Sequence, residues 1–302
     1  MAENLLDLEA LRRRIDEIDD RLQQLLAERV EIVSEIAARK RDGGTIAPHQ
    51  PAREAEIIRR LIAHNRGVFP PAALVRMWRE LLAATVRQQG AFTIAVYAPP
   101  EIPGIWDLAR DHYGSNTPMH AYRTTGQVIR AVTEGNASVG VLPMPQEGDT
   151  DPWWPHLLST EDRAPHVIAR LPFGGRGNAR TDGADALAIG RGLPQETGQD
   201  RTMFVSEHAP NISRGRIVAT LAALGLRCTF LASYEAAGGA NTLIEVDSFV
   251  GATDPRLDEF SERLGADLHR LLYLGAYAVP LSSMALAEHA AREAAAAGVA
   301  AG

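Results

Sequence analysis

The sequence predicts a multi-domain protein: an all-α N-terminal region of three helices, an α/β region, and a ferredoxin-like α+β region. Apolar residues recur with a helical period before Gly90, and strand-like and helix-like segments alternate after it. From residue 201 onward the segments follow the order strand, helix, strand, strand, helix, strand, which is typical of a ferredoxin-like fold. The 302 residues can fill two or three domain cores. We place the regions at residues 1–90, 91–200 and 201–281, with a C-terminal tail at 282–302.

The first predicted helix is too long for an ordinary globular helix. Apolar residues keep three- and four-residue spacing from Leu5 to about Arg41, which is nearly ten turns. Asp42-Gly43-Gly44 ends this helix, Pro51 opens a second one, and Pro70-Pro71 opens a third. The two shorter helices cannot cover the apolar stripe of the first along its whole length. We therefore expect a homodimer in which the long helices of two chains pair.

The segments after Gly90 predict alternating strands and helices. In the α/β region we expect strands at 92–100, 138–145, 166–173 and 184–190, and helices at 102–114 and 124–136. The stretch 146–199 is rich in Gly, Pro, Asp and Arg, which predicts a small and irregular fold there. In the ferredoxin-like region we expect strands at 202–208, 227–235, 241–250 and 268–279, and helices at 213–225 and 254–266. The Ala-rich tail predicts a terminal helix.

Composition excludes several classes of function. A net charge of −7 and a pI near 5.7 disfavour a nucleic-acid partner, because binding to phosphates requires a basic surface. The single cysteine, Cys228, excludes an intrachain disulfide and a cysteine-built zinc site, and we expect it in the core of a strand. No long uncharged apolar run is present, so we expect no membrane span. These features predict a soluble cytoplasmic protein.

Cations recur at the edge of the apolar stripe of the helical region, which indicates a site for a small anion. Arg29 and Lys40 are eleven residues apart, close to three helical turns, so their side chains leave the same face. Arg12 lies seventeen residues before Arg29, about a quarter-turn off that face and roughly 25 Å away along the axis. It therefore cannot easily reach the same ligand within one chain. Other arginines are expected to be solvated surface residues, namely Arg13, Arg14, Arg21, Arg39, Arg41 and Arg59.

Four motifs of the helical region occur together in one known family. They are LxxLRxRIDxIDxxLxxLLAERxEI from Leu8, the pair Arg39-Lys40, PAREAEI from Pro51, and the spacing of Thr85 and Gln89. With these motifs, residues 5–90 resemble the all-helical chorismate mutases, in which a dimer of three-helix chains rearranges chorismate to prephenate. Residues 92–280 more faintly resemble a shortened prephenate dehydratase followed by a regulatory ACT domain, as in the bifunctional enzyme of phenylalanine synthesis. The resemblance implies an isomerase of the shikimate pathway and of aromatic amino-acid biosynthesis.

The rearrangement of chorismate needs no cofactor, metal or nucleophile. A protein accelerates this intramolecular reaction by holding the reactive conformer of the dicarboxylate and stabilising the charge that develops on it. The resemblance implies that Arg12 of the partner subunit and Arg29 clamp the two carboxylates. Lys40 and Gln89 would donate to the ether oxygen, with Lys40 the rate-determining residue. Gln88 competes for the amide role but has the poorer spacing from Thr85.

The second and third helices supply the other implied substrate contacts. Glu54 would accept from the ring hydroxyl, and Arg53 would support the site. Thr85 replaces the family's commoner serine and would contact a carboxylate or orient a neighbour. Gln50 stands where the family usually has an aspartate, and its amide oxygen can still accept from a hydroxyl. The implied catalytic residues are thus Lys40, Gln89, Glu54 and Arg29, and the implied binding residues are Arg12, Arg29, Lys40, Gln50, Arg53, Glu54, Thr85 and Gln89.

The dehydratase motifs are altered in this chain. The sequence Thr202-Met203-Phe204 stands where that family has Thr-Arg-Phe, and a methionine cannot form an ion pair with a substrate carboxylate. Residues 141–145 lack the Glu and Asn that the family has there, and the ACT-like part lacks the family's Glu-Ser-Arg-Pro signature. We therefore expect a C-terminal region without catalysis, acting as a scaffold or regulator.

Three alternatives remain open. A bifunctional chorismate mutase/prephenate dehydratase would require activity despite Met203. An isochorismate pyruvate lyase on the same helical scaffold is disfavoured by the retained Glu54 and by the attached dehydratase-like region. A regulator without enzymatic activity would use its ACT-like part to bind a small molecule or a protein.

Overall fold

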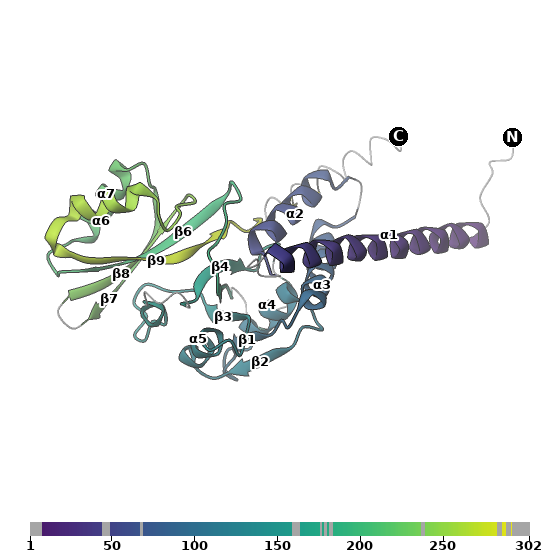
Figure 1. Ribbon diagram of the computed structural model, residues 1–302, viewed down its shortest axis with the longest axis horizontal. Helices are drawn as coiled ribbons and strands as arrows, with labels where there is room; N and C mark the ends of the chain where they lie inside the picture. The colour runs from purple at the N-terminus through teal and green to yellow at the C-terminus, as the bar shows by residue number, and fades with distance from the viewer. Residues whose placement is uncertain are drawn as a thin grey trace.

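The computed structural model describes most of the chain, from Leu8 to residue 291. The described residues are 8–43, 49–66, 69–158, 164–175, 177, 180, 184–236, 239–282, 286–287 and 291, with the backbone alone at 40–43 and 236. Three helices precede a nine-stranded sheet, whose strands run from the α/β region into the C-terminal region. Figure 1 shows this order from purple at the N-terminus to yellow at the C-terminus.

The helical region consists of α1 (Leu8–Gly43), α2 (Pro51–His64) and α3 (Pro71–Gln89). Proline occupies the first position of α2 and of α3, where its missing N–H costs nothing. Apolar side chains of α2 and α3, including Ile58 and Leu82, share one buried cluster with Phe173. By contrast, α1 projects away from the body of the protein (Figure 1), and Ala37 is its only buried side chain among those described.

The α/β region forms the first half of the sheet. Strand β1 (Ile94–Tyr97) lies between β2 (Met119–Tyr122) and β3 (Val139–Pro143), and both pairings are parallel. Strand β5 (Ala186–Gly190) then pairs antiparallel with β3 and with β4 (His166–Leu171). The connecting helices are α4 (Gly104–Tyr113), α5 (Thr125–Thr133) and the short η1 (Trp154–Leu157). The N-terminus of α5 is fixed by a capping box between Thr124 and Gln127.

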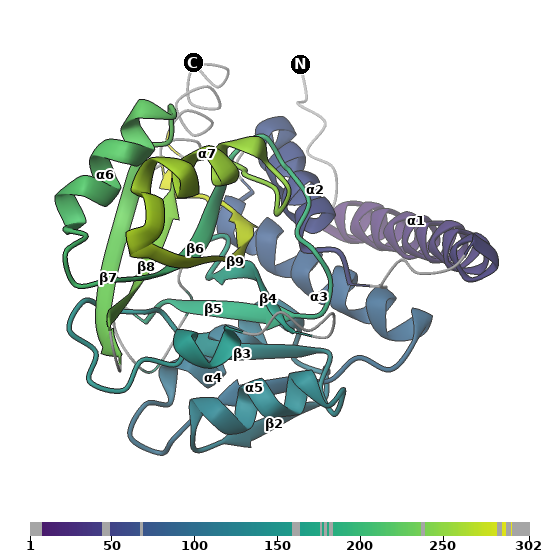
Figure 2. The ribbon, with the colours of Figure 1, turned by 60° about the vertical axis from the view of Figure 1, so that its left-hand side comes forward.

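The C-terminal region has the element order strand, helix, strand, strand, helix, strand. Its strands lie in the order β9, β6, β8, β7, with antiparallel neighbours. Both helices cover one face (Figure 2), where Ile217 and Phe260 pack against Phe204 and Ile244 of the sheet. The elements are β6 (Asp200–His208), α6 (Arg214–Ala223), β7 (Cys228–Ala236), β8 (Gly239–Val246), α7 (Pro255–Leu264), η2 (Gly265–Asp267) and β9 (Leu268–Ala278).

Strands β4 and β9 join the two halves into one sheet of order β2-β1-β3-β5-β4-β9-β6-β8-β7. Their parallel pairing brings Gly275 beside Val167. A Cβ atom at position 275 would lie 2.2 Å from the Val167 carbonyl oxygen, and φ there is 138°, so this approach requires glycine. In the described part of the chain, no helix is long and apolar enough to cross a membrane.

Arg59 connects α2 to the sheet, so the expectation that it is a solvated surface residue is wrong. Its guanidinium donates to the Thr197 hydroxyl and to the carbonyl oxygens of Gln199 and Val279, each at 2.8 Å. It also lies 5.7 Å from the centre of the Phe173 ring. These partners flank β6 and β9, so they place α2 directly against the junction of the two half-sheets.

Candidate functional site

A cavity of about 500 Å³ lies between the three N-terminal helices. Six of the eight residues predicted for the site line it, and the predicted Arg12 and Lys40 are not among the described lining residues. Exposed Gln88 is also absent from the lining, whereas Gln89 is present. The lining residues are Leu25, Glu28, Arg29, Ile32, Val33 and Ile36 of α1; Gln50, Arg53, Glu54, Ile57 and Arg60 at and after the start of α2; and Trp78, Leu82, Thr85, Val86 and Gln89 of α3.

Arg29 presents to this cavity a guanidinium nitrogen that has no hydrogen-bond partner among the described residues. Its Nη1 atom is buried and forms no hydrogen bond with any described residue. Burial lowers the pKa of the Arg29 guanidinium from its ordinary value. A buried donor without a partner is costly in a folded protein, and an anionic ligand in the cavity would satisfy it.

Glu54 is the buried carboxylate of the cavity wall, with 8% of its surface exposed. Its Oε2 accepts a hydrogen bond of 2.8 Å from Nη1 of Arg79, and its Oε1 lies 3.8 Å from Nε2 of His49. Arg79 is 4% exposed, and burial lowers its pKa while Glu54 opposes that shift. Motif comparison and spacing did not identify Arg79, because a single arginine within a helix carries no signal of burial.

The other four predicted lining residues differ in how they are held. Arg53 is exposed and forms an ion pair of 2.9 Å with Glu56. Gln50 is the N-cap residue of α2. The Thr85 hydroxyl donates to backbone carbonyls one turn earlier in α3, at 2.9 and 3.1 Å, and Gln89 donates at 3.1 Å to the carbonyl of Thr85. Thr85 is thus engaged with its own helix. Gln89 is the last residue of α3 and the last of its residues to line the cavity.

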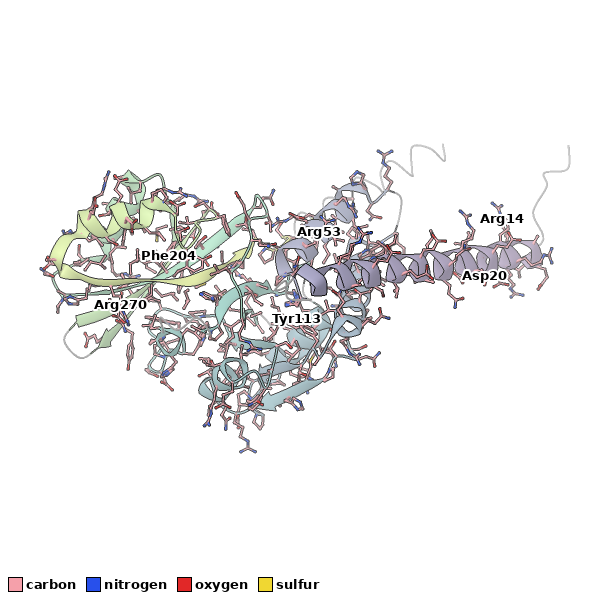
Figure 3. All side chains as sticks on the ribbon, viewed as in Figure 1. Arg14, Asp20, Arg53, Tyr113, Phe204 and Arg270 are labelled. Carbon is pink, nitrogen blue, oxygen red and sulfur yellow. The ribbon has the colours of Figure 1, made fainter. Side chains whose placement is uncertain are left out.

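The remaining two predicted residues lie on α1 outside the described cavity lining. Arg12 is exposed and pairs with Glu9 at 2.8 Å, about 25 Å along the helix from Arg29. Lys40 lies in the last part of α1, and its side chain is outside the described residues. Figure 3 shows Arg14 and Asp20 on the projecting part of α1, while Arg53 lies near its base. Within one chain, the structure therefore does not bring Arg12 to the cavity.

Aromatic residues of the α/β region enclose the Glu54–Arg79 pair. The His49 ring lies 5.1 Å from Phe92 and 5.6 Å from Tyr113, and the Tyr113 hydroxyl is buried with no hydrogen-bond partner among the described residues. Burial lowers the pKa of His49 and of neighbouring His112, and raises the pKa of Tyr113. Figure 3 marks Tyr113 beneath the helical region. The wall behind Glu54 is therefore of low polarity.

The residues aligned with the dehydratase motif are buried and engaged in the sheet. Met203 is 0% exposed, within the main hydrophobic core. The Thr202 hydroxyl donates to the Ser248 carbonyl at 2.8 Å and accepts from the Val250 amide at 2.9 Å. Among the described residues, no group of three or more His, Cys, Asp or Glu could hold a metal ion.

Comparison with known proteins gives a family match for the helical region and a sequence similarity that extends beyond it. Residues 11–90 match the family model described as chorismate mutase type II. The bifunctional chorismate mutase/prephenate dehydratase of Pseudomonas aeruginosa is 30% identical over 160 residues, which cover 51% of this chain and 42% of that protein. The protein of the same description from Aquifex aeolicus is 30% identical over 142 residues, covering 46% and 39%. The chain thus spans about two fifths of the length of these relatives.

Among solved structures, a prephenate dehydratase from Arthrobacter aurescens in complex with L-Phe aligns with 70% of this chain and 100% of its own. Its TM-score is 0.47 and its sequence identity 15%. A TM-score this low does not establish a shared fold.

Proposed function

We infer the function of this chain from residues 11–90, which belong to the chorismate mutase type II family. We propose that the protein rearranges chorismate to prephenate in the cavity between α1, α2 and α3, with chorismate and prephenate as its small-molecule partners. The observation that carries the proposal is that six of the eight residues predicted from the family motifs line one cavity of about 500 Å³. Residues from all three helices meet there, although the motifs are spread over more than seventy positions of the sequence.

The composition of the cavity suits a dianion whose charge shifts during reaction. Arg29 would bind one carboxylate through the buried guanidinium nitrogen that has no partner among the described residues, since a planar guanidinium suits a carboxylate. Gln89, together with Lys40, would donate to the ether oxygen as its bond to carbon breaks and negative charge grows there. Glu54 would accept from the ring hydroxyl through a lone pair not used by Arg79. Gln50, Arg53 and Thr85 complete the proposed binding surface.

The second carboxylate would be bound by Arg12 of the partner subunit, so the active form is a homodimer with shared sites. Two observations support this. Arg12 and Arg29 are separated along one helix by about 25 Å, which an arginine side chain does not span. The apolar face of the projecting α1 is exposed in the single chain: Ile15 is 57% and Leu22 50% exposed. Antiparallel pairing of two such helices would cover both faces and exchange the two arginines.

We assign no reaction to the C-terminal region. The boundaries 1–90, 91–200 and 201–281, with the tail at 282–302, define a mutase domain, a shortened dehydratase-like region and an ACT-like domain. Buried Met203 and the fully engaged Thr202 hydroxyl support the loss of dehydratase chemistry. The strand order β9-β6-β8-β7 and the two helices on one face support the ACT-like assignment.

Incubation of the purified protein with chorismate tests the reaction. Prephenate should accumulate, and acid treatment of the product should then yield phenylpyruvate. Phenylpyruvate without acid would favour the bifunctional alternative, and pyruvate from isochorismate would favour the lyase. If the protein turns over neither chorismate nor isochorismate, the remaining alternative is a regulator without enzymatic activity.

Mixed dimers test the shared site. A doubly tagged heterodimer of Arg12→Ala and Arg29→Ala chains contains one cavity with both arginines, so about half of the wild-type activity should return, although each parent is inactive. A heterodimer of Arg29→Ala and Lys40→Ala chains is the matched control, because both changes fall in the chain's own cavity and each cavity keeps one defect. Equal activity of the two heterodimers would contradict sharing.

A further inference from the structure

Arg79 of α3 lies directly behind the cavity, outside its lining. Its Nη1 donates to Oε2 of Glu54 at 2.8 Å, and the exposed fractions of the two side chains are 5% and 10%. The guanidinium carbon lies 5.2 Å from the centre of the Phe173 ring. Arg79 is therefore held between a cavity carboxylate and an aromatic face, which is a favourable place for a desolvated cation.

Phe173 comes from the α/β region, beyond the residues that match the mutase family. It follows β4, is buried in the cluster of α2 and α3, and its carbonyl accepts from the Leu281 amide at 2.7 Å. The neighbouring Gly174 forms a β-bridge with Leu281. The ring that faces Arg79 is thus positioned by the sheet and by the segment that follows it.

Charge explains why this arrangement matters for a dianionic ligand. A buried carboxylate in the wall repels a second anion strongly, because little water screens the pair. The groups that face Glu54 are Arg79, His49 and Tyr113, and the cavity-lining Arg53 is paired with Glu56. Burial lowers the pKa of His49 and raises that of Tyr113, so both favour the neutral form. Arg29 and Arg60 also line the cavity, but among the described residues Arg79 is the arginine that forms an ion pair with Glu54.

This inference rests on the proposed mutase function. We propose that Arg79 is a positioning residue of the mutase site: it fixes Oε2 of Glu54 and neutralises its charge, so that Glu54 can accept from the substrate hydroxyl while the substrate's carboxylates bind nearby. Phe173 holds Arg79 in place, and the α/β region thereby contributes to a site built by the three helices.

Steady-state kinetics with chorismate on R79M, E54Q and R79M/E54Q test the proposal. R79M should raise KM about 10- to 100-fold, because it leaves an uncompensated carboxylate beside the dianion. In the E54Q background the same substitution should change KM less than about threefold, because no charge remains to be offset. KM is measured because it does not depend on the fraction of folded enzyme. An equal effect in both backgrounds, or none in either, would overturn the proposal.

Three further variants keep the test decisive if R79M does not fold. R79K retains the charge and should keep KM within about fivefold of wild type. F173L retains an apolar side chain but removes the aromatic face, and should raise KM about two- to tenfold. R76M is the matched control, because Arg76 on the same helix forms an ion pair of 3.1 Å with Asp111 of α4 but does not contact Glu54; it should leave KM unchanged.

These outcomes separate the two proposals. Absence of mutase activity in the wild-type protein would overturn both. An active wild type would retain the proposed function, and in that case R79K behaving like R79M, or E54Q and R79M/E54Q differing by more than about threefold, would overturn the role of Arg79 alone. A wild-type KM in F173L would overturn the contribution of the α/β region.

Discussion

Among the described cavity residues, Arg29 has the surroundings that most directly indicate an anionic ligand. Its neighbour Glu28 also lines the cavity but accepts a hydrogen bond from the Gln24 amide, whereas the buried nitrogen of Arg29 has no described partner. Retaining an unsatisfied buried donor costs folding free energy, because the hydration of that nitrogen is lost without replacement. That cost is understandable if a bound carboxylate supplies the missing acceptor.

Replacement of Arg29 by methionine should therefore separate activity from stability. Arg29→Met keeps the aliphatic stem and removes a charge-assisted contact, so kcat/KM for chorismate should fall about 10²- to 10³-fold. The urea midpoint of unfolding should stay the same or rise, because the unsatisfied group is gone. Arg13→Met, on the opposite face of α1, is the matched control and should retain wild-type kinetics. A loss of stability without a loss of kcat/KM would assign Arg29 to the fold.

The family motifs, rather than helical spacing alone, singled out most of the predicted site residues. Spacing placed Arg29 and Lys40 on one face of the first helix, and the motifs added Glu54 and Gln89; Arg29, Glu54 and Gln89 line the same cavity. Arg59 and Arg79 could not be distinguished from ordinary surface arginines. Thr197 lies 138 residues from Arg59 and Phe173 lies 94 residues from Arg79, and only the tertiary fold creates those contacts.

Helix α1 is the element with the least support from its own chain. Its apolar stripe, from Leu8 to Ile36, is exposed over most of its length. An exposed apolar surface of this extent favours association with another protein surface. An isolated amphipathic helix in water gains little from its own hydrogen bonds, so its stability depends on packing. A second copy of α1 offers a surface of matching length.

A charge in the middle of this stripe should prevent the association. Leu22→Glu places a carboxylate where we expect the partner's apolar side chains, and burying it unpaired would cost several kcal/mol. We expect light scattering to give a dimer mass for the wild type and a monomer mass for the variant, with mutase activity reduced at least about tenfold. Asp20→Asn, on the opposite face, should remain dimeric and active. A monomeric wild type with full activity would contradict the shared site.

Prediction of the sheet elements succeeded where strands carry a buried pattern. Strand β5 is buried throughout, and its apolar run is visible in the sequence. Strand β2, by contrast, was not predicted: its two central residues, His120 and Ala121, are exposed, and it pairs only with β1 at the sheet edge. The pairing of β4 with β9 could not be predicted either, because it joins residues 167 and 275 without a local signal.

Arg59 is one of the residues that connect the helical region to the sheet. Its three hydrogen bonds of 2.8 Å reach residues before β6 and after β9. Arg59→Met should lower the free energy of unfolding by about 2 kcal/mol, since hydrogen bonds from charged groups contribute more than neutral ones and these are partly screened. Urea unfolding followed by circular dichroism measures this. Arg66→Met, an exposed arginine just beyond α2, should have no effect; equal midpoints for both variants would show that Arg59 does not stabilise the junction.

The contact between the helical region and α4 should make stability depend on mild acid. Burial lowers the pKa of His112 well below its ordinary value of 6.5, and nearby Arg79 and His49 act in the same direction. Below about pH 6.5 the unfolded chain binds a proton at this histidine that the folded chain does not, so the free energy of unfolding falls as pH falls.

Between pH 8 and pH 5, this loss should approach about 1.4 kcal/mol per pH unit for each such histidine once the pH is below the ordinary value. His112→Gln cannot titrate, so thermal melts should show a shallower decline for this variant than for the wild type. His120→Gln, at an exposed position of β2, is the matched control. An identical pH dependence for the wild type and His112→Gln would mean that His112 binds its proton as readily in the folded chain as in the unfolded chain, and would contradict the prediction.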